Sequence, residues 1–418
     1  MLKGIILSGG VGKRLDKYEI KPNVKLLGKR LIDYAYDMLK DLGIEDITII
    51  KSKSLDIKHK ACQIVQEKPL GTANALSLIK DKGIFLVIPV DTPLLKSDTL
   101  LNMIEYHFKN KNDITVLSSR VKNSYGYGRI FKHPLRIKEE KTLSAFQKRN
   151  RLVNAGVYIL NDRVLDFIDK IEKNRITNEY YFTDIFLYLP RKMKKGIFIT
   201  NDEDEILGIN SPLNLIDAEN ILSLRINEKH RLNNVFINKA RLGPDVIVGP
   251  GAKISDRSII LGKSIISKNS YILDSIIEDS FIEESSIGPY AHIVNSKIIG
   301  STIGNFVEVK NSEINPNTKV KHLSYIGNAI ISENVNIGAG VIFSNYDGRS
   351  KNTTRVGKNS FIGSNSTIIA PINIGDDCYI GAGSELTKSL NDETFYLRRA
   401  GEKIYINRKI IENDKELG

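Results

Sequence analysis

The chain has 418 residues, of which 41% are hydrophobic and 26% are charged, and this length predicts two or three domains rather than one. Its formal net charge of +12 is compatible with nucleic acid or with small anionic substrates. The lysines are spread along the chain and the densest basic run is only residues 191–195, so we expect small anionic substrates and no nucleic-acid partner.

The sequence shows no sign of a membrane or disulfide-bonded protein. Its longest clear apolar run, residues 83–90, is too short to span a bilayer and is typical of a buried strand. The first residues enter a strand directly, without the pattern of a signal peptide. Cys62 and Cys378 lie far apart with no C-x-x-C motif, which indicates a reducing compartment. We therefore expect a cytoplasmic protein.

A glycine-rich turn follows the first predicted strand, residues 3–7. Gly10, Gly12 and Arg14 lie in this turn, where backbone N–H groups can approach a phosphate without hindrance from Cβ atoms. The spacing fits neither a P-loop nor a dinucleotide-binding fingerprint. Taken alone, the turn is equally compatible with an ordinary connection between a strand and a helix.

Strands and helices then alternate. The patterns predict a helix over residues 31–42, a strand over 44–50, a helix opening after residue 70, and a buried strand over 84–90 that ends at Asp91. Such alternation predicts an α/β domain with a doubly wound, Rossmann-like parallel sheet. Ligands bind at the carboxyl ends of the strands in these sheets, where both the glycine turn and Asp91 lie.

Ser211 and Pro212 predict the start of a further helix that continues to about residue 230. We interpret it as a connecting helix, although it is also compatible with the last helix of the first domain.

The C-terminal half carries a six-residue repeat. Large aliphatic residues recur at that interval: Val356, Ile362, Ile368, Ile374, Ile380 and Leu386. Neither a helix nor an isolated strand has this period, whereas stacked coils of a parallel β-helix do. A β-sandwich with regular turns is the alternative. The repeat begins irregularly near residue 234, shortens between residues 272 and 287, and is interrupted by a polar segment, residues 344–355, where function is expected to concentrate.

Motifs in the N-terminal half resemble a known family. Gly10, Gly12, Arg14 and Lys21 match the signature L-x-x-G-x-G-x-R-[LM] and its following lysine, as in sugar-1-phosphate nucleotidylyltransferases. Further matches lie at residues 66–72 (Q-x-x-x-L-G-T), 91–94 (D-x-P-L), 126–130 (G-Y-G-R-I), 178–185 (N-E-Y-Y-x-T-D-I) and 208–215. In this order they resemble the bacterial family of bifunctional N-acetylglucosamine-1-phosphate uridylyltransferases and glucosamine-1-phosphate N-acetyltransferases. The resemblance covers nearly the whole chain.

The resemblance implies roles for residues of the first half. Arg14 and Lys21 would hold the triphosphate of UTP beside Gly10 and Gly12, and Asp91 with Asn210 would bind Mg²⁺. The base and the sugar would be bound by two further groups: Gln66, Gly71 and Thr72 for the base; Tyr127, Gly128 and Asn154 for the sugar. The chain departs from the family at Val90, which replaces a glycine, and near Phe146, where the expected sugar-binding glutamate is missing.

The same resemblance implies an acetyltransferase site in the second half. His322 would be the general base, since an imidazole titrates near neutral pH. Asn345 would support the reacting centre. The remaining residues would contact the two substrates: Lys310, Tyr325, Asn336 and Tyr346 the sugar phosphate; Ala339, Ser364, Ala382 and Arg399 acetyl-CoA. An arginine expected near Ala291 is absent. Solenoids of this kind usually form homotrimers.

The sequence thus predicts a nucleotidylyltransferase domain (1–210), a connecting helix (211–232), a left-handed parallel β-helix of hexapeptide repeats (233–390) and a charged tail (391–418) that folds over a neighbour or frays. Two alternatives remain: a glucose- or mannose-type nucleotidylyltransferase, specific for UTP or dTTP, whose solenoid is only a scaffold, and a non-catalytic assembly subunit. The presence of Arg14, Lys21 and Asp91 argues against the assembly subunit.

Overall fold

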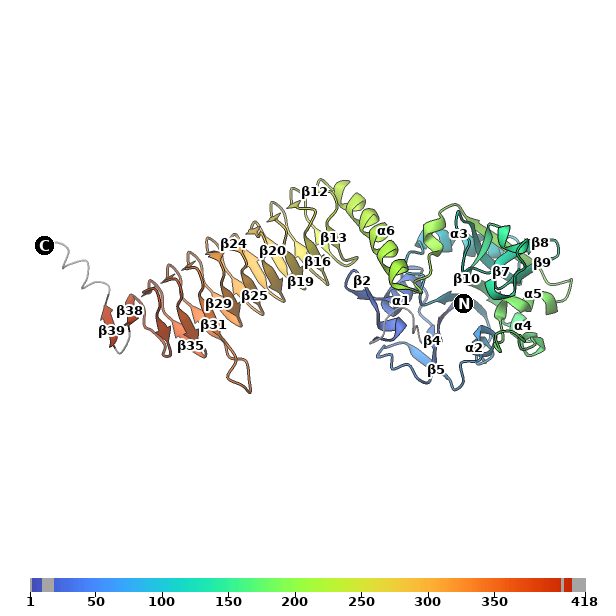
Figure 1. The fold of residues 1–418 in the computed structure, drawn as a ribbon, viewed down its shortest axis with the longest axis horizontal. Helices are drawn as coiled ribbons and strands as arrows, with labels where there is room; N and C mark the ends of the chain where they lie inside the picture. Colours follow the sequence, from blue (N-terminus) through green and yellow to red (C-terminus); the bar gives the residue numbers. More distant parts are fainter. Residues whose placement is uncertain (1, 10–18, 400–401, 408–418) are drawn as a thin grey trace, which may run out of the picture. The chain divides into compact units, whose positions relative to one another are not determined.

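The computed structural model describes residues 2–9, 19–399 and 402–407, with side chains described as far as residue 397. Two compact units, residues 1–221 and 222–418, divide the chain (Figure 1). None of the described helices has the length and apolar character that a membrane span requires.

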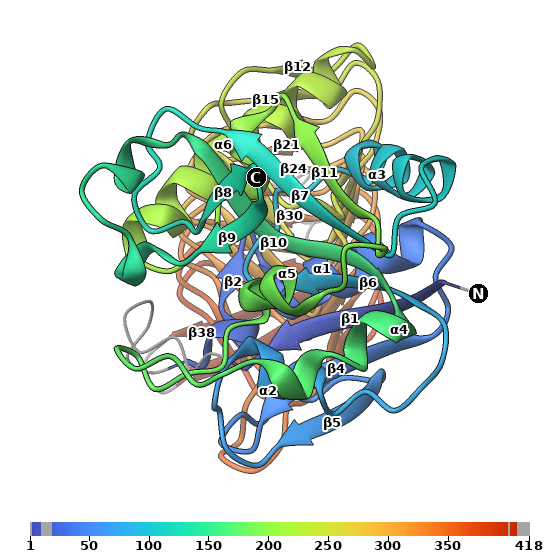
Figure 2. The same cartoon turned by 90° about the vertical axis from the view of Figure 1, so that its right-hand side faces the viewer.

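The first unit is an α/β domain. Its strands are β1 (Leu2–Ser8), β2 (Lys25–Leu26), β3 (Lys29–Arg30), β4 (Ile47–Ser52), β5 (Cys62–Gln66), β6 (Ile84–Pro89), β7 (Ile114–Arg120), β8 (Arg129–Lys132), β9 (Leu135–Lys138), β10 (Leu152–Asn161) and β11 (Lys195–Thr200). Among the described residues, the main sheet has the order β11-β7-β10-β6-β1-β4-β5, and the β8–β9 hairpin attaches to β10 (Figure 2). All neighbours along the main path pair in parallel except β10, which runs antiparallel to β6 and β7.

Helices cover both faces of this sheet. They are α1 (Leu31–Asp41), α2 (Thr72–Leu76), α3 (Ser97–Lys109), α4 (Asp162–Leu165) and α5 (Ile185–Tyr188). Ile5 of β1 belongs to the buried cluster that includes α2, α4 and α5, whereas a Cβ at the preceding Gly4 would meet Leu39 of α1. Because neighbouring strand residues point to opposite faces, α1 and α2 lie on opposite sides of the sheet. The predicted doubly wound sheet is therefore confirmed, although the strand expected over 44–50 spans Ile47–Ser52.

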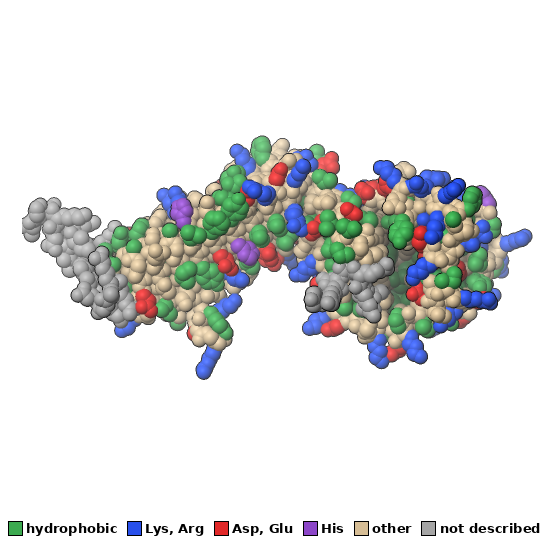
Figure 3. Space-filling model, viewed as in Figure 1, with side chains coloured by type: hydrophobic (Ala, Val, Ile, Leu, Met, Phe, Trp, Pro, Cys, Tyr) green, Lys and Arg blue, Asp and Glu red, His purple; other side chains and the backbone are tan. Residues whose placement is uncertain are grey.

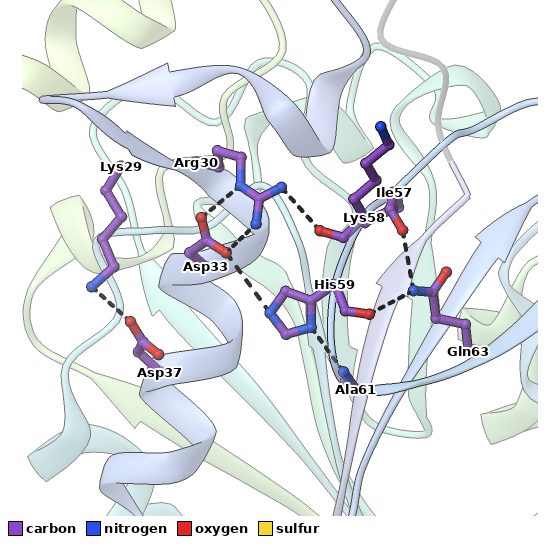
Figure 4. A network of polar contacts seen from close by, with 9 residues as sticks. All are labelled: Lys29, Arg30, Asp33, Asp37, Ile57, Lys58, His59, Ala61 and Gln63. Atoms are coloured by element: carbon purple, nitrogen blue, oxygen red, sulfur yellow. Dashed lines mark hydrogen bonds and ion pairs between the residues drawn. The ribbon is translucent and has the colours of Figure 1, made fainter.

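A polar network fastens the segment between β4 and β5 to the start of α1 (Figure 4). Arg30 pairs with Asp33 and donates to the carbonyl oxygen of Lys58 at 3.2 Å. The His59 ring lies edge-on to Tyr36, with 4.5 Å between ring centroids. The network thereby holds the segment that leads into β5, whose last residue is Gln66.

Helix α6 (Pro212–Arg231) begins in the first unit and ends in the second. Its start has the predicted cap, since Ser211 Oγ accepts the Asn214 N–H at 3.2 Å. Near its end, in the second unit, Ile226 packs on the solenoid core and Asn227 Nδ2 donates to the carbonyl oxygen of Ala240 at 2.9 Å. These last turns of α6 cover the first coil of the solenoid.

The second unit consists of three long sheets. The first contains β12 (Phe236–Ile237), β15 (Lys253–Ile254), β18 (Tyr271–Ile272), β21 (Ser286–Ile287), β24 (Thr302–Asn305), β27 (Lys319–His322), β30 (Asn336–Ile337), β33 (Phe361–Ile362), β36 (Tyr379–Ile380), β38 (Thr394–Arg399) and β39 (Glu402–Asn407). The second contains β13 (Arg241–Leu242), β16 (Ile259–Leu261), β19 (Ile276–Glu278), β22 (His292–Val294), β25 (Glu308–Lys310), β28 (Tyr325–Gly327), β31 (Ile342–Ser344), β34 (Thr367–Ile369) and β37 (Glu385–Leu386). The third contains β14 (Ile247–Val248), β17 (Ile265–Ile266), β20 (Phe281–Glu283), β23 (Lys297–Ile299), β26 (Glu313–Ile314), β29 (Ala329–Ile331), β32 (Thr354–Val356) and β35 (Ile372–Ile374).

Successive strands along each sheet pair in parallel, apart from the closing β38–β39 hairpin, which is the arrangement of a left-handed parallel β-helix of hexapeptide repeats. The six aliphatic residues of the predicted repeat are all at most 3% exposed and form one continuous core. Small buried residues lie at the corners between the sheets. The Ser264, Ser280 and Ser296 hydroxyls each accept a backbone N–H from the next coil, at 3.0–3.2 Å. Stacked hydroxyls thus satisfy backbone donors inside the solenoid.

The C-terminal end differs from the expected separate tail. Strand β38 continues the first sheet by pairing with β36, and its Tyr396 is only 1% exposed. The Tyr396 hydroxyl donates to the carbonyl oxygen of Glu385 at 2.6 Å. An aromatic side chain therefore covers the last coil where the sequence pattern has lost its six-residue period.

Candidate active sites

A cavity of about 620 Å³ lies at the carboxyl ends of β1, β5 and β6. Residues that the sequence analysis had singled out from distant parts of the chain line it together: Lys21, Gln66, Gly71, Thr72, Asp91, Tyr127, Gly128, Asn154 and Asn210. Gly10, Gly12 and Arg14 lie outside the described residues. The cavity therefore lies at the edge of the sheet where the sequence predicted ligand binding.

At one end of the cavity, two side-chain oxygen atoms contact the ammonium group of Lys21. The Lys21 ammonium group forms an ion pair with Asp91 and donates to Asn210 Oδ1 at 2.8 Å. Lys21 begins a short 3-10 helix (Lys21–Asn23), Asp91 follows β6, and Asn210 lies just before Pro212, where α6 (Pro212–Arg231) begins. The backbone beside Asp91 is held because the Val90 N–H donates to the Leu7 carbonyl oxygen at 3.1 Å. One carboxylate and one amide oxygen directed at a common point fit a Mg²⁺ ion that keeps waters and phosphate oxygens as its other ligands.

Gln66, Gly71 and Thr72 form the next wall. Gln66 is 3% exposed, and its Nε2 donates to Asn74 Oδ1 at 2.7 Å. Gly71 has φ = +113°, and a Cβ there would collide with the Tyr180 backbone. Thr72 Oγ1 accepts the N–H of Phe182 at 2.9 Å. The close approach that only glycine permits thus brings the segment around residues 180–182 against the start of α2.

A bulge in β10 directs Asn154 into the cavity. The pairing of β10 with β7 shifts between Asn154 and Tyr158, where Gly156 has φ = +76°. Asn154 Nδ2 donates to the Tyr158 hydroxyl at 2.8 Å, and its Oδ1 accepts the Gly156 N–H at 3.0 Å. Bulges of this kind re-aim side chains at active sites.

The cavity also contains a glutamate that was not predicted to lie there. Glu139 lies beside Gly128, where a Cβ would be 3.5 Å from Glu139 Oε2, and its Oε1 accepts the Thr183 hydroxyl at 2.8 Å. Burial raises the pKa of this carboxyl group. Phe146, where the glutamate had been sought, is 80% exposed. The β8–β9 hairpin pairs Arg129 with Lys138 and thereby returns Glu139 to Gly128, so the cavity contains a carboxylate from a different part of the chain.

In the second unit, four predicted residues form a column along one corner of the solenoid. Each belongs to a successive coil: His322, Ala339, Ser364 and Ala382. The carbonyl oxygens of the first three accept N–H groups of Gly340 at 3.3 Å, Asn365 at 2.8 Å and Gly383 at 2.8 Å, each directly after the next member of the column. His322 and Ala382 are exposed. The corner thus presents an imidazole above three small residues, a surface on which an extended ligand can lie.

The other predicted residues occupy different places on the solenoid. Lys310 and Tyr325 lie on β25 and β28, and the Tyr325 ring lies over Gly327, where a Cβ would be 2.5 Å from the tyrosine hydroxyl. Asn336 lies on β30 in the first sheet, whereas Asn345 and the exposed Tyr346 follow β31. Arg399 ends β38, and its side chain is outside the described part of the chain. One chain therefore carries these residues on two sheets and two corners. At the position of the missing arginine, His292 lies 3.8 Å from Glu278.

Comparisons with known proteins match both units. Residues 3–204 match the family model of nucleotidyl transferases, and residues 353–388 match the hexapeptide repeat of succinyl-transferase. A protein of Clostridioides difficile (strain 630), named bifunctional protein GlmU, is 35% identical over 99% of this chain and 99% of its own length. Proteins of the same name from Clostridium kluyveri and Streptococcus uberis are each 34% identical, over 97% of both chains and 96% of both chains respectively.

Proposed function

The chain belongs to the family of bifunctional GlmU proteins, and we therefore propose that it performs two successive reactions of UDP-N-acetylglucosamine synthesis. The β-helix transfers an acetyl group from acetyl-CoA to glucosamine-1-phosphate. The α/β unit then couples N-acetylglucosamine-1-phosphate to UTP and releases pyrophosphate. The observation that carries the proposal is the convergence of nine residues, from Lys21 to Asn210, on one cavity at the carboxyl edge of the sheet.

Uridylyl transfer requires a phosphate oxygen of the sugar to attack the α-phosphorus of UTP while pyrophosphate leaves. Lys21, together with Arg14, stabilises the charge that develops on the phosphate oxygens, and Asp91 with Asn210 would hold Mg²⁺. The ion, when bound, neutralises negative charge on the triphosphate. Gln66, Gly71 and Thr72 bind the base, and Tyr127, Gly128, Glu139 and Asn154 bind the acetylated sugar. The position of these four residues in the lining of one cavity supports this assignment.

Acetyl transfer requires the sugar amine to attack the thioester carbonyl while CoA leaves as the thiol. His322 takes the proton that the amine loses. Acetyl-CoA lies along the corner formed by Ala339, Ser364 and Ala382, with Arg399 beyond them, which places the thioester next to the imidazole. Lys310, Tyr325, Asn336 and Tyr346 bind the sugar phosphate, and Asn345 supports the reacting amine.

We also propose a homotrimer in the cytoplasm. The acetyl-transfer residues lie on two sheets and two corners of one chain, so a neighbouring chain is needed to enclose the substrates. Both cysteines are unpaired, which suits a reducing compartment. Small anionic substrates account for the excess of basic residues, which in the view of Figure 3 are dispersed over the surface and mixed with acidic ones.

The proposal is tested by supplying glucosamine-1-phosphate, acetyl-CoA, UTP and Mg²⁺ to the full chain, and measuring free thiol and pyrophosphate. Both products are expected, and thiol release should depend on the amino group of the sugar. Pyrophosphate without thiol release, with glucose- or mannose-1-phosphate as substrate, would identify a nucleotidylyltransferase with a scaffolding solenoid. Absence of both products would identify an assembly protein. Replacing UTP by dTTP determines the base preference.

A further inference from the structure

Asparagines lie along the solenoid corner that follows the second sheet, whereas the His322 column lies along the corner that follows the first sheet. Asn295, Asn311 and Asn328 begin the turn after successive strands of the second sheet, each with a left-handed φ of 46°, 50° and 50°. Their backbone N–H groups donate to the preceding coil, at 2.9–3.0 Å. Asparagine tolerates this conformation better than most residues, so a structural reason accounts for the repeat. The Asn295 and Asn311 side chains bond to each other, whereas the Asn328 side chain contacts the polar segment that interrupts the solenoid.

Asn328 holds both ends of the polar excursion that interrupts the solenoid. The chain leaves the second sheet after Ser344 and rejoins the third at Thr354. Asn328 Oδ1 accepts Asn345 Nδ2 at 2.7 Å, where the excursion begins, and its backbone carbonyl accepts the Thr354 N–H at 3.1 Å, where it ends. Its own N–H donates to the Lys310 carbonyl oxygen at 2.9 Å.

Other hydrogen bonds of the excursion join residues within it. The Asn352 N–H donates to the Asn345 carbonyl oxygen at 2.7 Å and joins its two ends. At its tip, the Asp347 carboxylate accepts the N–H groups of Arg349 and Ser350 at 2.8 and 2.7 Å, which holds the pKa of Asp347 well below its ordinary value. These bonds restrain the excursion internally, and the bond to Asn328 fixes the carboxamide of Asn345 at its start.

We propose that Asn328 is a positioning residue for acetyl transfer, which acts by fixing the carboxamide of Asn345. Asn345 is 7% exposed, and its amide nitrogen is committed to Asn328. Its oxygen atom is thereby left as a hydrogen-bond acceptor for the reacting amine. An amine whose N–H is held by an acceptor keeps its lone pair directed at the thioester, and a misplacement of about 1 Å can cost on the order of 100-fold in rate. The inference rests on the proposed acetyl transfer.

The chain offers matched variants for a test in the full-length protein. Asn328→Gly removes the carboxamide at a φ that glycine adopts freely, and Asn311→Gly makes the same change one coil away, where the side chain accepts Asn295 Nδ2 at 2.8 Å instead of Asn345. Asn328→Asp keeps an acceptor for Asn345 Nδ2. We expect Asn328→Gly to lower kcat/KM for the amino-sugar phosphate by about 10- to 100-fold with KM for acetyl-CoA unchanged. Asn311→Gly should stay within about twofold of the wild type, and Asn328→Asp should recover most of the loss.

Two further measurements separate the causes of failure. Amide hydrogen exchange at Asn352 and Thr354 reports loosening of the excursion independently of activity, and it should accelerate in Asn328→Gly only. In a chain that already carries Asn345→Ala, the further change Asn328→Gly should not lower kcat/KM, because Asn328 is proposed to act only through Asn345. Equal kcat/KM for Asn328→Gly and Asn311→Gly, or additive losses in the double variant, would overturn the inference. A wild-type chain without acetyl transfer would instead overturn the proposed function.

Discussion

The ammonium group of Lys21 forms an ion pair with the carboxylate of Asp91 inside the cavity of the first unit. Both side chains are largely buried, at 10% and 19% exposure, so each charge depends on the other in the absence of ligands. If Asp91 and Asn210 hold a divalent cation, as proposed, the ion and the Lys21 ammonium group would compete for the same two side chains. The proposed metal site therefore predicts that metal binding and the position of Lys21 are linked.

Removal of divalent metal should abolish uridylyl transfer and leave acetyl transfer unchanged. Among the described residues no cluster of three or more His, Cys, Asp or Glu side chains could hold a metal. Asp91 and Asn210 would supply only two ligands, so we expect phosphate oxygens of the nucleotide to strengthen binding. Calorimetric titration with Mg²⁺ should therefore show binding at least about 10-fold tighter with UTP present than without it. Tight binding to the chain alone, or pyrophosphate formation in excess chelator, would contradict the assigned metal site.

Gly71→Ala should destabilise the first unit and raise KM for UTP. The new Cβ would collide with the Tyr180 backbone at a φ of +113°. Gly43→Ala is a suitable control because Gly43 also has a positive φ, +75°, but a Cβ there would meet no described atom within 4 Å apart from its chain neighbours. Urea denaturation should show a loss for Gly71→Ala that exceeds the control by about 1–3 kcal/mol. Equal losses in the two variants would show that the close approach is not needed.

Glu139→Gln should stabilise the first unit relative to the wild type, by an amount that grows as the pH rises. Burial raises the native pKa of Glu139 above its ordinary value of 4.5, so the native state binds this proton more tightly than the unfolded state. The resulting stabilisation is complete below about pH 4.5 and is lost as the pH rises through the native pKa. Free energies of unfolding for wild type and variant should therefore converge at low pH and separate toward neutral pH. The same substitution at exposed Glu172 should give no such separation, and parallel curves for Glu139→Gln would contradict the argument.

Ala382→Phe should raise KM for acetyl-CoA by about 10-fold or more and leave uridylyl transfer unaffected. The substitution places a bulky ring in the corner column two coils beyond Ala339, where a ligand extended from His322 would lie. Lys388→Phe, an exposed position outside that column, serves as the control. Steady-state kinetics with acetyl-CoA varied decides the matter, and unchanged KM values in Ala382→Phe would place the ligand elsewhere.

The sequence predicted the fold well where a physical period or a chain of motifs was present. A six-residue spacing of large aliphatic residues fits stacked coils, each of which places one such residue on each of three sheets. The residues from Val356 to Leu386 were predicted to form the solenoid core, and their burial confirms it. The family predicted from the motifs is confirmed as well. The domain boundaries and the roles of the individual site residues remain predictions.

The contacts that the sequence did not predict depend on the register between strands and on where strands begin and end. Glu139 was missed because its neighbour is set by the length of the β8–β9 hairpin, which no periodicity encodes. Strand β38 was expected to be tail because it lacks the hexapeptide period, and only the buried Tyr396 reveals its packing. The Asn328–Asn345 bond joins residues 17 apart across coils of unequal length, which spacing alone could not align.

The central claim is that two separate sites on one chain catalyse the two reactions. The most direct measurement assays both activities in His322→Ala and Asp91→Ala, with folding checked by thermal unfolding. We expect His322→Ala to lose acetyl transfer by at least about 100-fold and to keep uridylyl transfer, and Asp91→Ala to show the reverse. Loss of both activities in either folded variant would contradict the account.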